Sequence, residues 1–171
     1  MNWLKAFKTI SLPLILGVSL SACGADGKYQ KLPITKPFEL HKMNAKVEVY
    51  FKITEENDYA YILLFHHNKE NSDEVLELMA HSERGKKDTD GEPIYVSLEV
   101  FKVDKDIEYL DTQYGTQSLP LYSSGATFDK LIYRGSLLPG LYRAVVTSNK
   151  DMPAFNHVKV DLQVSFAHKP K

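Results

Sequence analysis

The stretch KVEVYFKI, residues 46–53, decides the fold class of this chain. Its apolar side chains fall at every second position, and the residues between them are charged or carry a hydroxyl. Successive side chains of a strand point to opposite faces of a sheet, so this pattern predicts a half-buried strand. Working outward, similar extended patterns predict strands at 38–40, 59–66, 94–103, 127–134, 141–147 and 158–166. Residues 59–66 are apolar on both faces, which indicates a central strand.

One segment departs from this period of two. Asn71 and Glu74 resemble a capping box, and apolar residues follow them at helical spacing, so we expect one short helix near 72–80. Residues 102–118 are charged, contain Gly115 and are predicted to be rich in loops. Strands separated by turns, with no long amphipathic helix and no internal repeat, favour an all-β, mainly antiparallel β-sandwich.

The most specific local signal is LLPGLY, residues 137–142. Pro139 and Gly140 suit the two central positions of a type II turn, because proline fixes the first φ and glycine accepts the positive φ of the second. Tyr142, two residues later, resembles the tyrosine corner of immunoglobulin-like and fibronectin-like Greek-key sandwiches. The resemblance implies that fold, with Tyr142 buried and its hydroxyl bonded to the backbone near Leu137 or Leu138.

The first residues have the order of a secretory signal. Lys5 and Lys8 precede an uncharged, mostly apolar stretch, 9–20, which leads into the small residues before Cys23. The apolar stretch is shorter than the ~20 residues that a membrane-spanning helix needs. The segment LSAC, residues 20–23, resembles the lipobox of bacterial lipoproteins, which implies cleavage before Cys23 and attachment of lipid to its thiol. The alternative is an ordinary signal peptide with an incidental cysteine.

These patterns divide the chain into a signal peptide (1–22), a lipidated tether (23–36) and one β-sandwich domain (37–169). An extended tether of this length could reach about 40 Å at ~3.3 Å per residue. In the lipoproteins that the segment resembles, an aspartate directly after the cysteine favours retention in the inner membrane. Here that residue is Gly24. We therefore expect a lipid-anchored protein of the cell envelope, at the outer membrane and facing the periplasm.

Charge and cysteine content exclude some functions. The chain has 21 basic and 22 acidic residues, and removal of Lys5 and Lys8 with the signal leaves 19 and 22, a formal charge of −3. A basic field for nucleic acid is therefore not expected. Cys23 is the single cysteine, so an intramolecular disulfide is impossible and the core must supply the stability of the domain.

No arrangement of residues points to an enzyme or to a cofactor. The sequence lacks a nucleophile elbow, an H-E-x-x-H pair and a glycine-rich phosphate loop. His66 and His67 would point to opposite faces if the strand continued through them, which disfavours a shared metal ion. The acidic run of 104–111 lacks the glycine and the spacing of a calcium-binding EF-hand loop, and it is predicted to be solvated. We therefore predict no catalytic residue, metal or cofactor.

Five tyrosines form the candidate binding surface, because they fall on predicted outward positions or in loops: Tyr50, Tyr95, Tyr109, Tyr114 and Tyr122. Tyrosine is favoured at protein interfaces, although aromatic cover of a sheet explains any one of them equally well. The chain is therefore predicted to be a non-catalytic module that binds a protein. The specific hypothesis is an immunity protein that neutralises a toxin in the periplasm, such as a secreted phospholipase effector. The alternative is an accessory lipoprotein for envelope assembly or surface binding, and an enzyme or metal carrier comes third.

Overall fold

A computed structural model describes residues 27–79, 91–116 and 121–167, without the side chains of 116 and 121–124. Within these residues the elements are β1 (Ile34–Pro37), β2 (Lys46–Ile53), β3 (Asn57–His66), α1 (Ser72–Met79), β4 (Val96–Asp104), β5 (Ile107–Thr116), β6 (Leu121–Ser124), β7 (Thr127–Leu137), β8 (Gly140–Ser148) and β9 (Val160–Phe166). A single 3-10 turn, Pro153–Phe155, precedes β9. The expected strand 46–53 and the expected short helix are both present.

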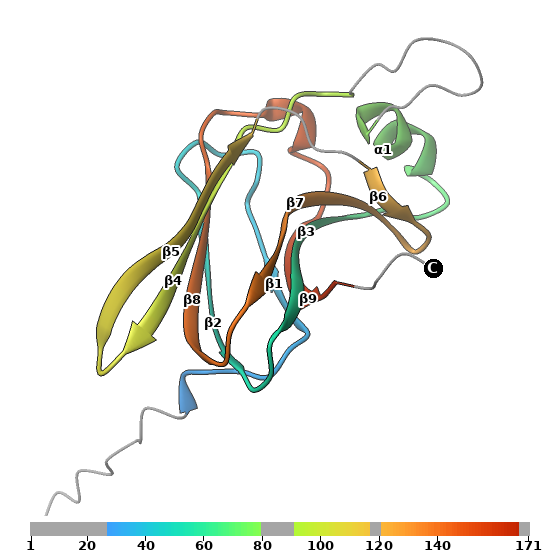
Figure 1. The fold of residues 1–171 in the computed structure, drawn as a ribbon. Helices are drawn as coiled ribbons and strands as arrows, with labels where there is room; N and C mark the ends of the chain where they lie inside the picture. The colour runs from blue at the N-terminus through green and yellow to red at the C-terminus, as the bar shows by residue number, and fades with distance from the viewer. Residues whose placement is uncertain (1–26, 80–90, 117–120, 168–171) are drawn as a thin grey trace, which may run out of the picture.

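Two sheets pack face to face and enclose the core (Figure 1). Sheet A has the order β2-β8-β4-β5, and sheet B has the order β1-β9-β3-β7-β6. Every pair of neighbouring strands among the described residues is antiparallel. The prediction of an antiparallel all-β sandwich with one short helix is therefore confirmed.

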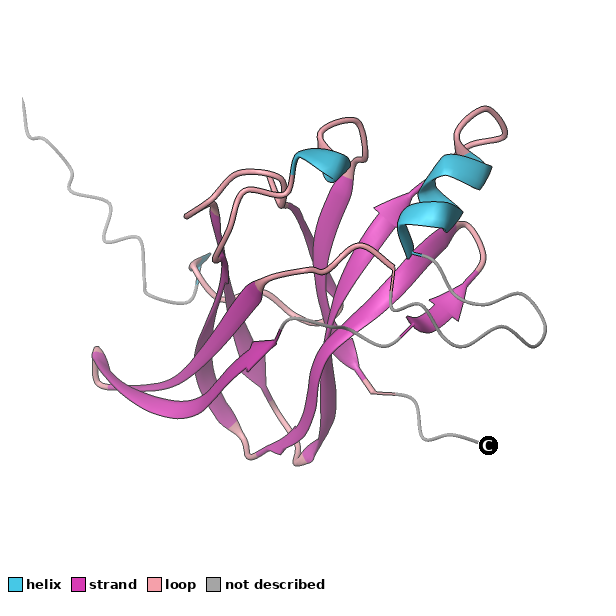
Figure 2. Cartoon of the chain, turned by 90° about the horizontal axis from the view of Figure 1, so that it is seen from above, coloured by secondary structure: helices cyan, strands magenta, loops and turns pink. Residues whose placement is uncertain are grey.

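The chain crosses between the sheets at most of its connections. Among the described strands, only β4–β5 and β6–β7 follow one another within one sheet, and both pairs are hairpins. Seen from above, the helix lies at one end, over the sheet B side of the sandwich (Figure 2). Its Val75 and Met79 are fully buried, which explains why the short amphipathic segment is helical.

The core follows the period of two. Val47, Val49, Phe51 and Ile53 are buried along β2, and the residues between them are exposed or half-buried. In β3, both Tyr61 on the inner face and Ala60 on the outer face are buried, as expected of a strand in the middle of a sheet. The Phe51 ring stacks on the Tyr142 ring, with centroids 5.6 Å apart, and meets Tyr61 edge-on at 6.5 Å.

Two tyrosine corners hold one end of the sandwich. Tyr142 is 1% exposed, and its hydroxyl donates a hydrogen bond of 2.9 Å to the carbonyl of Leu138, which confirms the predicted corner. Tyr59 repeats the arrangement, because its hydroxyl donates to the carbonyl of Glu55, also four residues earlier and also at 2.9 Å. Each tyrosine follows a crossing between the sheets, β7 to β8 and β2 to β3 respectively. The second corner was not predicted.

The predicted type II turn at Pro139 and Gly140 is wrong. Gly140 has a φ of 158° and already belongs to β8, whereas the second central residue of a type II turn needs a φ near +80°. The physical reason is that the chain passes here from one sheet to the other and does not return as a hairpin. A Cβ at Gly140 would lie in tight contact, 3.1 Å, with the Cε of Lys102.

The fold begins earlier than the sequence predicted. Residues assigned to the tether form β1, which pairs with β9, and the expected strand at 38–40 is absent. Gln30 bonds to the edge of β2 that faces away from β8, since its amide donates to the Tyr50 carbonyl and its carbonyl accepts from the Lys52 amide. Phe38 and Leu40 are buried in the core without belonging to a strand. Cys23 and the predicted signal peptide lie outside the described residues.

The prediction that 102–118 is rich in loops is wrong, because this segment contains the end of β4 and the whole of the ten-residue strand β5. Lys105 and Asp106 have φ of 50° and 65°, the two positive values of a type I′ turn. This turn matches the twist of the flanking strands and joins them through a two-residue loop.

Among the described residues, no helix has the length and apolar character needed to cross a membrane.

Candidate binding surface

The β4–β5 hairpin carries half of the large hydrophobic side chains that stand exposed among the described residues. It curves outward at one side of the sandwich, as both views show (Figures 1 and 2). β5 pairs with β4 on one side, and its other edge is the end of sheet A. Of the eight large hydrophobic side chains that stand exposed among the described residues, four belong to this strand: Ile107, Tyr109, Leu110 and Tyr114. Because exposed apolar patches are typical of interaction surfaces, β5 is the candidate binding surface.

Both faces of β5 carry exposed side chains near the turn. Tyr109 is opposite Lys102 in the register, on the face that turns toward sheet B, and it is still 54% exposed because little covers the sheet there. Leu110 is opposite Phe101 on the outer face and is also 54% exposed. Asp111 has no partner in β4 and forms a β-bulge between Leu110 and Thr112. The side chains of β5 therefore change faces of the sheet at this point.

Arg143 organises the outer face of sheet A. Its Nε and one terminal nitrogen donate to the two carboxylate oxygens of Glu108, at 2.9 and 2.6 Å, and the carboxylate raises the pKa of the guanidinium. The same guanidinium lies 4.5 Å above the Phe101 ring and 3.5 Å from Glu48. This arrangement fixes the tip of the hairpin to β8 while leaving Leu110 open to solvent.

The structure brings together only two of the five predicted tyrosines. Tyr109 and Tyr114 share β5, and the Tyr114 ring reaches across to Tyr133 of sheet B, 5.7 Å away. Tyr50 lies on the outer face of β2, at the other edge of sheet A, with its hydroxyl bonded to Glu48. Tyr95 precedes β4, is half-buried and lies under the Lys150 ammonium at 4.0 Å. Tyr122 belongs to β6, where side chains are outside the described part.

A row of rings leads from the exposed Tyr114 into the core. Tyr133 contacts Tyr114 and also the buried Tyr61, whose ring centroid lies 6.4 Å from its own. The Tyr61 hydroxyl has no hydrogen-bond partner, the one such buried side-chain atom among the described residues. Burial raises its pKa above the usual tyrosine range, and the carboxylate of Asp111 raises it further.

The histidines have separate partners, and nothing in the described residues gathers metal ligands. The His66 ring nitrogen lies 2.7 Å from an Asp161 carboxylate oxygen, whereas the His67 ring stacks on Phe128 and bonds to the Gly125 carbonyl. No group of three histidine, cysteine or carboxylate side chains able to hold a metal ion occurs in the part of the chain that the structure describes. The acidic residues of the hairpin are spread along its turn and strand.

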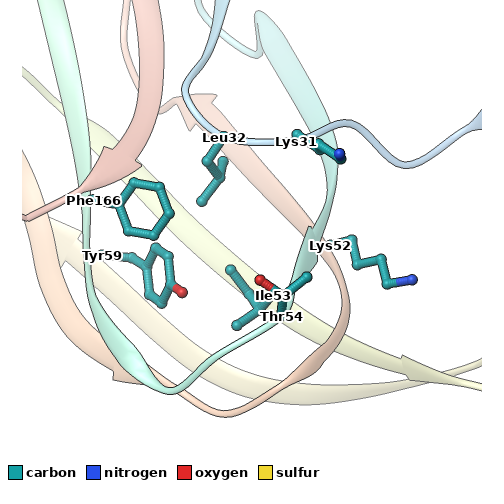
Figure 3. Close-up of a pocket in the computed structure, with 7 residues that line it drawn as sticks. All are labelled: Lys31, Leu32, Lys52, Ile53, Thr54, Tyr59 and Phe166. Carbon is teal, nitrogen blue, oxygen red and sulfur yellow. The ribbon is translucent and has the colours of Figure 1, made fainter.

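A pocket of about 470 Å³ lies at the corner end, beside the segment that precedes β1. The Phe166 ring faces the Tyr59 ring, with centroids 5.4 Å apart, and Leu32 stands next to them (Figure 3). Lys31 and Lys52 line the rim and extend away from the apolar floor (Figure 3). The Tyr59 hydroxyl is already bonded to the backbone. The described lining therefore provides an apolar floor and two cationic side chains, and no reacting group.

A family model matches residues 35–166, nearly the whole β-sandwich. The chain belongs to the DUF5625 family. That model is described as a domain of unknown function, so the DUF5625 match assigns the domain without assigning an activity. A comparison with curated proteins finds no match.

Two solved structures are similar to the DUF5625 domain. The crystal structure of GEBA250068378 from Sulfurospirillum deleyianum is 19% identical, with a TM-score of 0.63, and the match covers 80% of this chain and 98% of that one. At this identity the likeness shows the fold alone. A ruminal GH26 endo-beta-1,4-mannanase is 13% identical, with a TM-score of 0.39, over 83% of this chain and 27% of its own.

Proposed function

We propose that this chain is a lipid-anchored module of the cell envelope that binds a protein partner and catalyses no reaction. The observation that carries the proposal is the concentration of exposed apolar side chains on β5, where Ile107, Tyr109 and Leu110 are each more than half exposed. A monomeric soluble domain seldom leaves such a strand uncovered, because a long open edge with apolar side chains invites association. The β5 edge is therefore the surface at which we place the partner.

The lipobox resemblance supplies the location. With lipid on Cys23, the domain would stand close to the membrane, because the backbone is already bonded to β2 at Gln30. The seven residues from Cys23 to Gln30 span at most about 23 Å, at ~3.3 Å per residue. This tether is much shorter than the one expected from the sequence, and it places the partner near the lipid surface as well.

The specific function that we propose is immunity against a toxin in the periplasm, such as a secreted phospholipase effector. A toxin that attacks lipid must come close to the membrane, where a tightly tethered inhibitor would meet it. The small single domain and the exposed edge strand support an inhibitor that acts by contact.

Gene deletion in the presence of an adjacent toxin gene tests this function. We expect the deletion strain to kill itself, and the wild-type chain to restore growth and to co-purify with the toxin. A Cys23→Ala chain should still bind purified toxin and yet protect less well. A healthy deletion strain with an intact, active neighbouring toxin would contradict immunity. Recovery of housekeeping envelope proteins in the same purification would favour the accessory function.

A further inference from the structure

We infer that β5 takes its partner by strand addition, and that the added segment is an extended stretch rich in lysine or arginine. This inference rests on the proposed function and names the mode of binding and the chemistry of the partner. It concerns the tip of the hairpin, Ile107–Leu110, between the turn and the bulge.

The backbone of the tip is suitably oriented for strand addition. Asp104 and Ile107 form the pair that closes the two-residue turn, and such a pair exchanges both of its backbone hydrogen bonds. Bonded and non-bonded pairs alternate along an antiparallel ladder, so the amide and carbonyl groups of Glu108 and Leu110 face the open edge. The tip therefore offers two outward donor and acceptor pairs to an incoming strand.

The side chains around this edge provide the contacts that an added strand needs. Ile107 and Tyr109 project from one face and Leu110 from the other, and all three are more than half exposed. An added strand places alternate side chains on both faces, next to these groups. Glu108 is occupied, because Arg143 holds its carboxylate.

The bulge at Asp111 limits the site in length. An extra residue there breaks the regular spacing of outward groups, and edge strands use such bulges to prevent unlimited pairing. The tip is thus a short docking edge of four residues, Ile107–Leu110.

Charge identifies the occupant. Residues 104–111 contain four carboxylates and one lysine, and because Arg143 neutralises Glu108, a net charge of −2 remains at the tip. Asp104 and Asp106 make no ion pair within the described part of the chain, so their field is directed to solvent at the turn. A basic strand is attracted to this edge and steered to it. A second copy of the same hairpin would bring two acidic edges together, which disfavours self-pairing.

The test is selection of a random ten-residue peptide library on the folded mature chain. We expect the retained peptides to alternate lysine or arginine with β-branched or aromatic residues. Retained peptides that are neutral or acidic, or a library from which nothing is retained, would overturn the inference. A dimer in light scattering that a substitution at Leu110 dissociates would also overturn it, in favour of a second copy.

Two substitutions at one position separate strand addition from simple apolar contact. Leu110→Pro removes the outward amide and leaves the bonds to β4 intact, and Leu110→Ala removes the side chain alone. We expect the affinity for a retained peptide to fall at least tenfold further in Leu110→Pro than in Leu110→Ala. Equal losses would overturn strand addition.

The role of charge is tested with separate variants that leave the backbone of the docking edge unchanged. This test therefore remains valid if Leu110→Pro misfolds. Asp104→Asn with Asp106→Asn should weaken binding about tenfold at low salt and flatten its salt dependence. Asparagine tolerates the positive φ at residue 106. The control is Glu74→Gln with Glu77→Gln, which removes equal charge from exposed positions of α1 and should change nothing. Equal effects of the two pairs would overturn the charge argument.

Failure of this inference can be told apart from failure of the proposed function. If the wild-type chain and Leu110→Pro bind the purified neighbouring toxin equally well, strand addition is wrong and the proposed function stands. If the wild-type chain does not bind that toxin and deletion is harmless, the proposed function is wrong.

Discussion

Two regions meet at Leu141, which pairs with Lys52 on one side and with Val103 on the other. On the first side lie the two tyrosine corners, at the crossings from β2 to β3 and from β7 to β8. Buried tyrosines there bond to the backbone, and aromatic rings stack. On the second side lies the hairpin tip, where Leu110 is 54% exposed. The difference teaches that the buried contacts of the corners and the exposed edge at which we propose the partner lie in adjacent but separate parts of the sandwich.

The largest expected effect is the loss of Phe51 from the first region. Phe51→Ala should lower the free energy of unfolding by about 3–5 kcal/mol, because the ring is fully buried between Tyr142 and Tyr61. Leu110→Ala should change it by less than about 0.5 kcal/mol, since the side chain is exposed. Urea unfolding followed by circular dichroism measures both. Similar losses from the two variants would show that the tip is part of the cooperative core.

The next effect concerns Tyr61 and alkaline pH. Burial raises the pKa of Tyr61 above its unfolded value near 10, so above pH 10 the unfolded chain loses this proton while the folded chain keeps it, and the free energy of unfolding falls as the pH rises. Each pH unit above 10 should cost the wild-type chain up to about 1.4 kcal/mol on account of this group. Tyr61→Phe should be at least as stable at pH 8, because an unpaired buried hydroxyl disappears.

Urea unfolding at several pH values between 8 and 11.5 measures this contribution. The curves for wild type and Tyr61→Phe should diverge above pH 10, and parallel curves would contradict the assignment. Tyr59 and Tyr142, whose pKa burial also raises, are present in both chains and cancel in the comparison.

Alternation predicts strands well where one face is buried and poorly where neither is. β2 matched its prediction at both ends, and the corner at Tyr142 was predicted because proline and glycine precede the tyrosine there. The equivalent corner at Tyr59 follows a turn without either residue, so no such signal marked it. The beginning of the fold was missed because β1 is only four residues long, with Ile34 its one buried side chain.

The candidate surface was harder to predict because its pattern is irregular. In IEYLDTQYGT, residues 107–116, the bulge at Asp111 shifts the alternation, and both faces of the tip are exposed. The turn is Lys105-Asp106, without the glycine that usually marks a type I′ hairpin. The roles of Phe101 and Arg143 depend on strands that are distant in sequence and adjacent only in the sheet. Tyrosine content pointed to Tyr109 and Tyr114, which were expected in a loop-rich segment and lie in β5, and did not identify Ile107 or Leu110.

The two corners should have similar and moderate effects. Tyr142→Phe and Tyr59→Phe each remove a hydrogen bond to a backbone carbonyl and keep the ring, so each should lower the free energy of unfolding by about 1 kcal/mol. Tyr61→Phe is the matched control, since it removes a hydroxyl from a buried ring without breaking a bond. If all three variants lost the same stability, the hydrogen bonds would not be the cause of the loss at the corners.

The smallest effect is expected where the two regions are joined, at Glu108. Glu108→Gln weakens the forked bond with Arg143 and should cost about 0.5 kcal/mol, because the pair is partly exposed and screened by solvent. Thermal unfolding at low salt and at 1 M salt measures the difference, which should shrink at high salt. Glu99→Gln on the neighbouring strand is the control, because the carboxylate of Glu99 accepts only a long hydrogen bond of 3.4 Å from the side chain of Gln113 among the described residues. A loss above 2 kcal/mol that salt leaves unchanged would mean that Glu108 acts as a buried structural anchor, and the hairpin tip would then belong to the same stable unit as the corners.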